Sequence, residues 1–496
     1  MAGGNCRAVT NPQPTTNRWR AMSVALVAGF MTLLDVSIVN VALPSIRDDL
    51  HLSAGELQWV LAGYALTFGL LLVPAGRFGD ARGRRDVFIA GLAVFTLASA
   101  AAGLATGPAW LIVARLVQGA AAGVVNPQVS GLIQQLFEPR ERGKPFGLLG
   151  ATIGVSTAVG PLLGGLLIAI FGAEQGWRWI FYINVPIGAI AIMLGWRWIP
   201  GRPRAERSRE SLDPVGVALL GIGVLLLLLP LVQEREWHGQ AKWLLVVAAA
   251  AVLAGFVGWE RRFGRHGTPV VDLELFRVRS YALGALIATL YFAGFTTIFF
   301  IYTLFLQSGL HYTALEAGLA VTPFALGSAA AAALGGRIVN RYGRPLVAIG
   351  LVAVAVGLAA TEVVLHFVPG HDAGWAAALP LLVAGLGSGL VISPNQTLTL
   401  SQVPVRRAGS AGAVLQTGQR IGTALGIAVV GAVFFNRLAN NGGSWGLAFR
   451  AALLVTIGFV LIALVAAVAD VIVSRRPDHH AQSDDVGAGT RRPAAG

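Results

Sequence analysis

Long apolar stretches separated by short polar segments dominate the chain. A helix that spans a bilayer needs roughly 20 mostly apolar residues, and fourteen stretches of that kind can be marked out. They begin near Ala21, Ser53, Asp86, Ala109, Lys144, Trp177, Asp213, Ala241, Ser280, Ala314, Pro345, Gly374, Ala408 and Trp445. The pattern predicts an all-α polytopic membrane protein with 14 transmembrane helices.

Composition favours the same class. The 496 residues are 55% hydrophobic and 12% charged, with a mean hydropathy of +0.68. A soluble domain needs more charge to cover its surface. Cys6 is the single cysteine, which excludes internal disulfides and disfavours a cysteine-ligated metal site. The N-terminus has no apolar region followed by a cleavage site, so we expect the first span to act as its own membrane signal.

The distribution of charge explains the net charge of +13, which could otherwise suggest a nucleic-acid partner. An even number of spans puts both termini on one side, and most of the basic residues fall on that side. The exceptions are Arg47, Arg178, Arg235, Lys242, Arg437 and Arg450 on the opposite side, with Arg115 and Arg420 inside spans. Because basic loops stay in the cytoplasm, we expect a multi-pass protein of the cytoplasmic (inner) membrane with both termini cytoplasmic and no nucleic-acid partner.

A short segment occurs twice. "GRFGDARGR" at 76–84 recurs as "GRIVNRYGR" at 336–344, with Asn340 in the place of Asp80. Each copy lies on the cytoplasmic side, after the second helix of its half. Copies on the same side indicate a parallel repeat, which is a transporter architecture. Two similar turns arising by chance in a glycine- and arginine-rich chain are the alternative.

The repeat predicts how the chain is divided. Two pseudo-symmetric six-helix halves flank an inserted helix pair, which gives a 6+2+6 arrangement. The expected divisions are a cytoplasmic N-terminal segment at 1–20, the first half at 21–200, a linker with two helices at 201–279, the second half at 280–473 and a disordered cytoplasmic tail at 474–496.

Five motifs carry a family resemblance. They are "LDVSIVNVALPSI", "GRFGDARGRRDVF", "RLVQGAAAG", "GVSTAVGPLLGG" and "GWRWIFYINVPIG", all in the order and topological place of the family. With them the chain resembles the major facilitator superfamily, in its fourteen-helix drug:proton antiporter branch. The resemblance implies the major facilitator fold, no cofactor, a proton gradient as the energy source and a monomer.

Asp35 is the one carboxylate between Arg20 and Arg47. Helical rise places it ~22 Å from Arg20, and it places Arg115 ~10 Å below the outer face, at a shared depth. An unpaired charge in lipid would cost several kcal/mol, so each side chain needs a partner or a cavity. A purely structural Asp35–Arg115 pair is one interpretation. The other, which the family resemblance favours, is a proton-coupling site, because burial raises the pKa of a carboxyl group and a nearby guanidinium lowers it.

The loop motif has Asp80 among arginines on a turn that glycines permit. We expect its residues to latch the second helix to the other half, through ion pairs and a carboxylate at a helix N-terminus. The resemblance implies a gating role for Gly76, Asp80, Gly83, Arg84 and Arg85.

The fifth span carries the resemblance to an antiporter motif. The Gly160-Pro161 pair removes a backbone hydrogen bond and invites a kink, while small residues let a neighbouring helix approach closely. The residues assigned to this motif are Gly154, Gly160, Pro161, Gly164 and Gly165.

Polar side chains inside the spans are candidates for a substrate cavity, although for each amide a hydrogen bond between helices is an equal alternative. The candidates are Asn40, Gln118, Asn126, Gln416, Gln419 and Arg420.

Together these features favour a secondary active transporter that exports small, largely apolar drugs or antibiotics in exchange for protons. Proton-coupled uptake on the same fold is the first alternative, and a membrane enzyme is the second. We do not expect the protein to be an enzyme, because the chain has no His-Glu-x-x-His, Gly-x-Ser-x-Gly or Walker motif.

Overall fold

The computed structural model describes residues 15–201, 213–232, 239–264, 269–368, 370–440 and 444–474, and within these ranges it is helical and without strands. The predicted all-α class is therefore confirmed. The α-helices are α1 (Thr15–Leu50), α2 (Ala54–Arg82), α3 (Arg84–Gly103), α4 (Pro108–Leu136), α5 (Gly143–Tyr182), α6 (Asn184–Trp198), α7 (Pro214–Val232), α8 (Leu244–Phe263), α9 (Arg279–Leu304), α10 (Ala314–Tyr342), α11 (Arg344–Phe367), α12 (Ala373–Ala376), α13 (Ala378–Thr399), α14 (Ala408–Asn440) and α15 (Trp445–Ser474).

Thirteen helical segments of the described chain are long and apolar enough to cross a membrane. The remaining predicted span, the one expected from Asp213, is a shorter apolar helix at Pro214–Pro230. The helices therefore lie where the apolar stretches are, while the count of fourteen full-length spans stays a prediction. The disordered tail predicted at 474–496 lies, beyond Ser474, outside the described residues.

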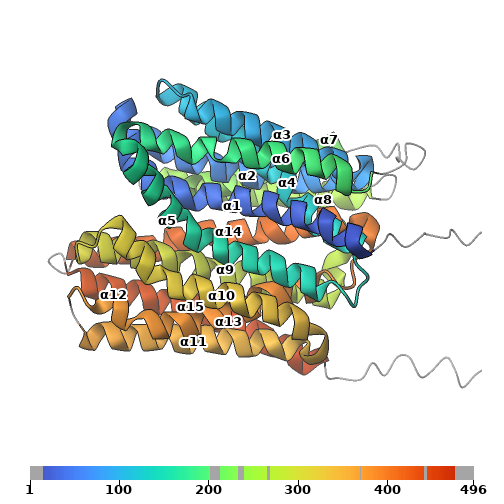
Figure 1. Cartoon of the computed structure of the whole chain (residues 1–496). Coiled ribbons are helices and arrows are strands. Elements are labelled where there is room, and N and C mark those ends of the chain that lie inside the picture. Colours follow the sequence, from blue (N-terminus) through green and yellow to red (C-terminus); the bar gives the residue numbers. More distant parts are fainter. Residues whose placement is uncertain are drawn as a thin grey trace, which may run out of the picture.

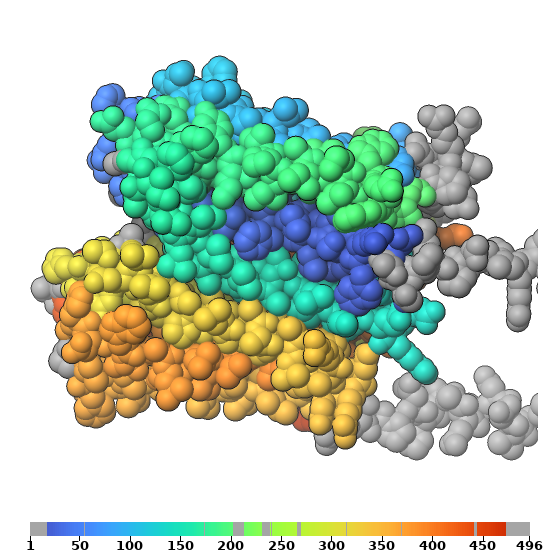
Figure 2. Space-filling view, viewed as in Figure 1, coloured from blue at the N-terminus to red at the C-terminus, as the bar shows by residue number. Residues whose placement is uncertain are grey.

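The helices gather in two groups, which Figure 1 shows one above the other. The N-terminal group holds α1–α6 and the C-terminal group holds α9–α15. Between them, α5 packs on both α1 and α10, and α14 packs on both α9 and α2. Figure 2 shows α5 lying against α10 along the visible face. The inserted helices α7 and α8 pack on each other, and α7 also contacts α2 and α14.

The sequence repeat is also a repeat of backbone conformation. Gly83 (φ 110°) joins α2 to α3, and Gly343 (φ 59°) joins α10 to α11. Both lie in the positive-φ region that glycine adopts without steric cost. At the other ends, Ser53 caps α2 and Thr313 caps α10, each in a capping box with a glutamate. The two groups are thus built on one template from the start of their second helix to its end.

The end of the molecule at which α1, α5 and α14 begin and α2 and α10 finish is called the basic end below. It lies on the right in Figure 1 and carries the loop motif and its repeat.

Candidate functional site

Asp35 lies in a buried polar cluster between α1 and α4. Its side chain is 0% exposed and forms an ion pair with Arg115, whose side chain is 1% exposed. Gln118 joins the pair: its Nε2 donates to Asp35 Oδ1 (2.8 Å), and its Oε1 accepts from Arg115 Nη1 (2.8 Å). The two charges therefore satisfy each other inside the bundle, in the depth relation that the helical rise predicts.

Two further polar side chains complete the cluster. Asn184 at the start of α6 and Ser99 of α3 are both buried, and Asn184 Nδ2 donates to Ser99 Oγ (3.0 Å) and toward Asp35 Oδ1 (3.4 Å). Gln118 Nε2 also lies 3.2 Å from Ser99 Oγ. Side chains from α3, α4 and α6 thus surround the carboxylate of Asp35 on α1. A core held together by apolar packing alone would not require these polar contacts.

Aromatic rings connect this cluster to the other helix group. Arg115 lies 4.3 Å from the centroid of the Tyr64 ring, and one turn further along α2 the guanidinium of Arg420 lies 4.1 Å from the Phe68 ring. Arg115 belongs to the N-terminal group, whereas Arg420, on α14, belongs to the C-terminal group. Each of these two α2 rings therefore has one cation stacked on it, one from each group. Within the described chain, no ion pair of Arg420 with a carboxylate occurs, and its side chain keeps partial exposure.

At the basic end, Asp80 ties α2 to α14. Its carboxylate accepts the backbone N–H groups of Gly409 (3.0 Å) and Ser410 (2.8 Å), the first turn of α14. Arg84 donates to Asp80 Oδ1 (2.8 Å) and also to the carbonyl oxygen of Val405, just before α14. A carboxylate at a helix N-terminus accepts hydrogen bonds from backbone N–H groups that have no partner within the helix. Its negative charge also interacts favourably with the positive end of the helix dipole. This is the contact that the loop motif led us to expect.

The glycines of the loop motif allow this contact, whereas Arg85 takes no part in it. A Cβ at Gly76 would lie 2.6 Å from the Gly409 carbonyl oxygen, so α2 and α14 touch backbone to backbone. Arg85 instead pairs with Asp86 (3.1 Å) and lies over the Trp196 ring, both within the N-terminal group.

The glycines of the α5 motif differ in the neighbouring helix that they contact. A Cβ at Gly154 would lie 2.9 Å from backbone atoms of α10, and one at Gly160 would lie 2.0 Å from Ser37 Oγ of α1. Gly164 also faces α1, at Ile38, while nothing lies within 4 Å of a Cβ at Gly165. Three of the four glycines are therefore interface positions.

The break in α5 lies outside the motif. The one residue inside α5 with non-helical dihedrals is Gly172 (φ 81°), whereas Pro161 stands in a run of helical ones. Gly172 ends the apolar span Gly143–Gly172, and the next span, Glu174–Trp198, begins just after it. This glycine therefore turns the chain between two spans, where a positive φ carries no steric cost for a residue without a side chain. The kink at Gly160-Pro161 stays a prediction.

Alanine substitution tests this division. Gly154→Ala and Gly160→Ala should lower both the thermal unfolding midpoint and the transport rate, because an added methyl in a closely packed contact costs about 1–3 kcal/mol. Gly165→Ala should match the wild type in both measurements. Equal loss in all three variants would contradict the contact assignment.

The remaining cavity candidates are spread over several environments. Asn40 is exposed and bonds its own helix at Val36, while Asn126 donates to Thr32 Oγ1 of α1 (3.1 Å). Gln416 of α14 donates to Ser130 Oγ of α4 (3.2 Å), a bond between the two groups. Gln419 lies partly exposed beside Arg420. Gln118, by contrast, is fully buried in the Asp35 cluster and is no candidate for ligand contact in this conformation.

One buried cation at the basic end had no sequence signal. Arg142 is 4% exposed and donates to the carbonyl oxygens of Gln134 and Phe137, where α4 ends. Burial lowers the pKa of its guanidinium, and the neighbouring Arg84 cation lowers it further. Among the described residues, no group of three or more His, Cys, Asp or Glu is placed to hold a metal ion.

Sequence comparison connects the chain to transporters. A family model described as Major Facilitator Superfamily matches residues 25–427 and 284–493. A probable actinorhodin transporter of Streptomyces coelicolor is 38% identical over 434 residues, covering 87% of this chain and 75% of that protein. The tetracenomycin C resistance and export protein of Streptomyces glaucescens is 32% identical (85% and 77% covered), as is the multidrug export protein EmrB of Haemophilus influenzae (83% and 80% covered).

Solved structures share the fold. The human organic anion transporter MFSD10 aligns with a TM-score of 0.68 at 15% identity, covering 92% of this chain and 100% of that one. The proton:xylose symporter XylE aligns with a TM-score of 0.65 at 16% identity, covering 91% and 95%. At such identities the likeness establishes the fold alone, and it confirms the predicted major facilitator architecture.

Proposed function

Because the chain belongs to the major facilitator superfamily, we propose that it exports small, largely apolar drugs or antibiotics across the cytoplasmic membrane in exchange for protons. The observation that carries the proposal is the Asp35–Arg115 pair, a carboxylate buried at 0% exposure among amides. Relatives that are named as export proteins support the direction of transport.

The exchange uses the carboxylate of Asp35. A proton that enters from outside neutralises it and removes half of the ion pair, so the charge of Arg115 is then held by the Gln118 and Val60 carbonyl oxygens. A buried guanidinium without its counterion is costly, which favours a rearrangement that exposes the cluster to the other side. Release of the proton there restores the pair and resets the transporter.

The gating loop, which contains Asp80, acts at the membrane face opposite to the one from which the proton enters. We place the basic end and both termini in the cytoplasm, since basic loops are retained there. Asp80 at the N-terminus of α14 then holds the cytoplasmic side closed while the site faces outward. The protein would work as a monomer, since both helix groups that alternate access requires come from one chain.

The substrate path follows from the partly exposed polar residues where the groups meet. Arg420 of α14 lies against Phe68 of α2, Gln419 is its partly exposed neighbour, and Asn126 of α4 is a further partly exposed amide. A cation without a carboxylate partner attracts acidic groups, so Arg420 should bind anionic or acidic substituents of an otherwise apolar substrate.

Charge at position 420 should therefore set substrate preference. Arg420→Gln should raise the KM for an acidic dye by about 10–100-fold, the equivalent of one charge-assisted hydrogen bond of about 1.5–3 kcal/mol, and leave an uncharged dye unaffected. Arg437→Gln, on the exposed outer end of α14, is the matched control. Equal loss of both dyes in Arg420→Gln would contradict the assignment.

Export itself is tested in proteoliposomes with an imposed pH gradient and the compounds for which the relatives are named, actinorhodin and tetracenomycin C among them. We expect substrate to move against the proton flux, and to stop moving when an ionophore collapses the gradient. Substrate movement in the same direction as the protons would instead establish uptake by symport.

A further inference from the structure

Two junctions join the helix groups at the basic end, and the repeat relates them. In one, Gly76 of α2 packs against Gly409 at the start of α14. In the other, Gly336 of α10 packs against Gly143 at the start of α5, where a Cβ on Gly336 would lie 2.2 Å from the Gly143 carbonyl oxygen. Each junction sets the end of a second helix against the beginning of a helix of the other group.

The junctions differ in their negative charge. In the first, Asp80 caps the N-terminus of α14. In the second, Asn340 occupies the repeat position, and its amide donates to the Arg140 carbonyl oxygen instead of accepting from α5. The start of α5 has no side-chain cap. The second junction therefore repeats the backbone contact of the first without a carboxylate at the position of Asp80. The carboxylate nearby, that of Glu141, is paired with Arg18.

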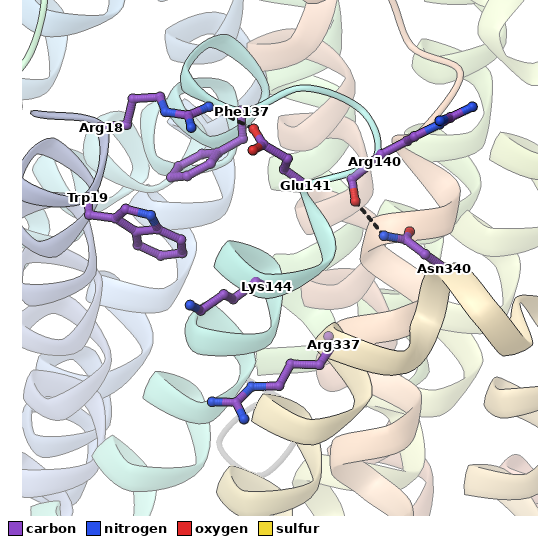
Figure 3. A pocket seen from close by; sticks show the side chains of 9 residues that line it. Arg18, Trp19, Phe137, Arg140, Glu141, Lys144, Arg337 and Asn340 are labelled. Carbon is purple, nitrogen blue, oxygen red and sulfur yellow. Dashed lines mark hydrogen bonds and ion pairs between the residues drawn. The ribbon is translucent and has the colours of Figure 1, made fainter. Parts of the chain in front are cut away.

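A cavity of about 390 Å³ opens at this second junction. Figure 3 shows that its lining comes from both groups. The lining residues are Arg18, Trp19, Phe137, Arg140, Glu141, Lys144, Gly336, Arg337 and Asn340.

Two of the cations that line the cavity, Lys144 and Arg337, are available to bind an anion. Arg18 is neutralised by Glu141 (2.7 Å), and the Arg140 guanidinium points away from the other lining residues (Figure 3). Lys144 of α5 lies over the Trp19 ring at 4.7 Å, and Arg337 of α10 extends beside it from the opposite group. In the described chain neither of these two cations forms an ion pair with a carboxylate.

We propose that this cavity binds a phosphate group, the headgroup of an anionic lipid of the cytoplasmic leaflet, which bridges Lys144 and Arg337 across the two helix groups. Basic pockets between membrane helices on the cytoplasmic side bind such headgroups. The anion supplies the charge that Asp80 supplies at the other junction and Asn340 lacks. The rings of Trp19 and Phe137, 4.9 Å apart edge to face, form an apolar wall for the glycerol and upper acyl chains.

The bound phosphate favours one conformation. Its two cations come from different groups, so it contacts both of them when the basic end is closed. A ligand shifts a conformational equilibrium by its difference in affinity for the two states. An anionic lipid therefore stabilises the conformation whose cytoplasmic side is closed, independently of whether the substrate is a drug.

The test compares lipids and variants of the full-length protein in detergent. We expect phosphatidylglycerol to raise the thermal unfolding midpoint of the wild type more than phosphatidylcholine does. This excess should be lost in the Lys144→Gln/Arg337→Gln double variant. Arg341→Gln should keep it, because Arg341 is an exposed cation that lies on α10 outside the cavity.

Each result decides the proposal. If the double variant keeps the excess, or if Arg341→Gln loses it equally, the response is to surface charge in general and the cavity is no site. Inorganic phosphate separates the sources of the anion. A shift by inorganic phosphate that needs Lys144 and Arg337 would support the cavity but assign it to a free anion, while no shift would assign it to lipid. A double variant that fails to fold is replaced by Lys144→Arg/Arg337→Lys, which should retain the excess if the site exists.

Discussion

Asp35→Asn should abolish export driven by a pH gradient while leaving substrate exchange across the membrane intact. The side chain that would take up and release the proton becomes an amide, and the shape of the buried cluster is kept. The measurement is transport in proteoliposomes in two modes: net export under a pH gradient, and counterflow with substrate on both sides and no gradient. Counterflow requires the change of access but no net proton movement, so the two modes separate proton coupling from general damage.

A structural role for the ion pair predicts a different outcome, and a second variant distinguishes it. Removing one partner of a buried ion pair costs about 3–5 kcal/mol, because the other charge stays buried alone. Asp35→Asn alone is therefore expected to be less stable, and Asp35→Asn/Arg115→Gln should recover stability by removing both charges. If the double variant also recovers gradient-driven export, Asp35 is a structural partner and the proton site lies elsewhere. Recovery of stability without recovery of gradient-driven export supports the proton role.

The features of the site that could be predicted from the sequence are those that depend on how deep a residue lies in the membrane. The rise of a helix fixes how far along the bilayer normal a residue lies, and a buried charge requires a partner. Those two facts placed Asp35 and Arg115 together. The expectation that Asp80 meets a helix N-terminus depends on chemistry of the same simple kind, since a helix start has unsatisfied donors wherever it lies.

Features that depend on rotation about a helix axis could not be predicted. Gln118 was a cavity candidate because it is polar and mid-span, and it lies instead against Asp35. Asn184 and Ser99 reach the same cluster through the orientation of α6 and α3, which the even apolarity of these helices leaves open. Arg85 likewise is adjacent to Arg84 in sequence but turns to its own group.

Other features had a sequence signal that can be recognised afterwards. "SAGE" at 53–56 and "TALE" at 313–316 are capping-box patterns at matching places in the repeat, and they extend the similarity of the two halves to the opposite end of the second helix. The turn at Gly172 likewise falls in the short segment that separates two apolar spans, Gly143–Gly172 and Glu174–Trp198.

Asp80→Asn should open the basic end. The substitution gives the first junction the residue that the second junction already has at Asn340, and it removes the charge that binds Gly409, Ser410 and Arg84. Hydrogen bonds to a charged group contribute about 1.5–3 kcal/mol each. Loss of about 2 kcal/mol changes the ratio of closed to open conformations about 30-fold, so transport should fall even though Asp35 and its cluster are unchanged.

The population shift can be measured directly as a distance. With Cys6, the single cysteine, replaced by serine, spin labels at the exposed positions 82 and 406 report the separation of α2 from the start of α14. In Asp80→Asn the long-distance population should grow at the expense of the short one. Asp86→Asn is the matched control, because Asp86 pairs with Arg85 inside the N-terminal group and should leave the distribution as in the wild type. An unchanged distribution in Asp80→Asn would mean that the backbone contacts between the glycines hold the basic end closed by themselves.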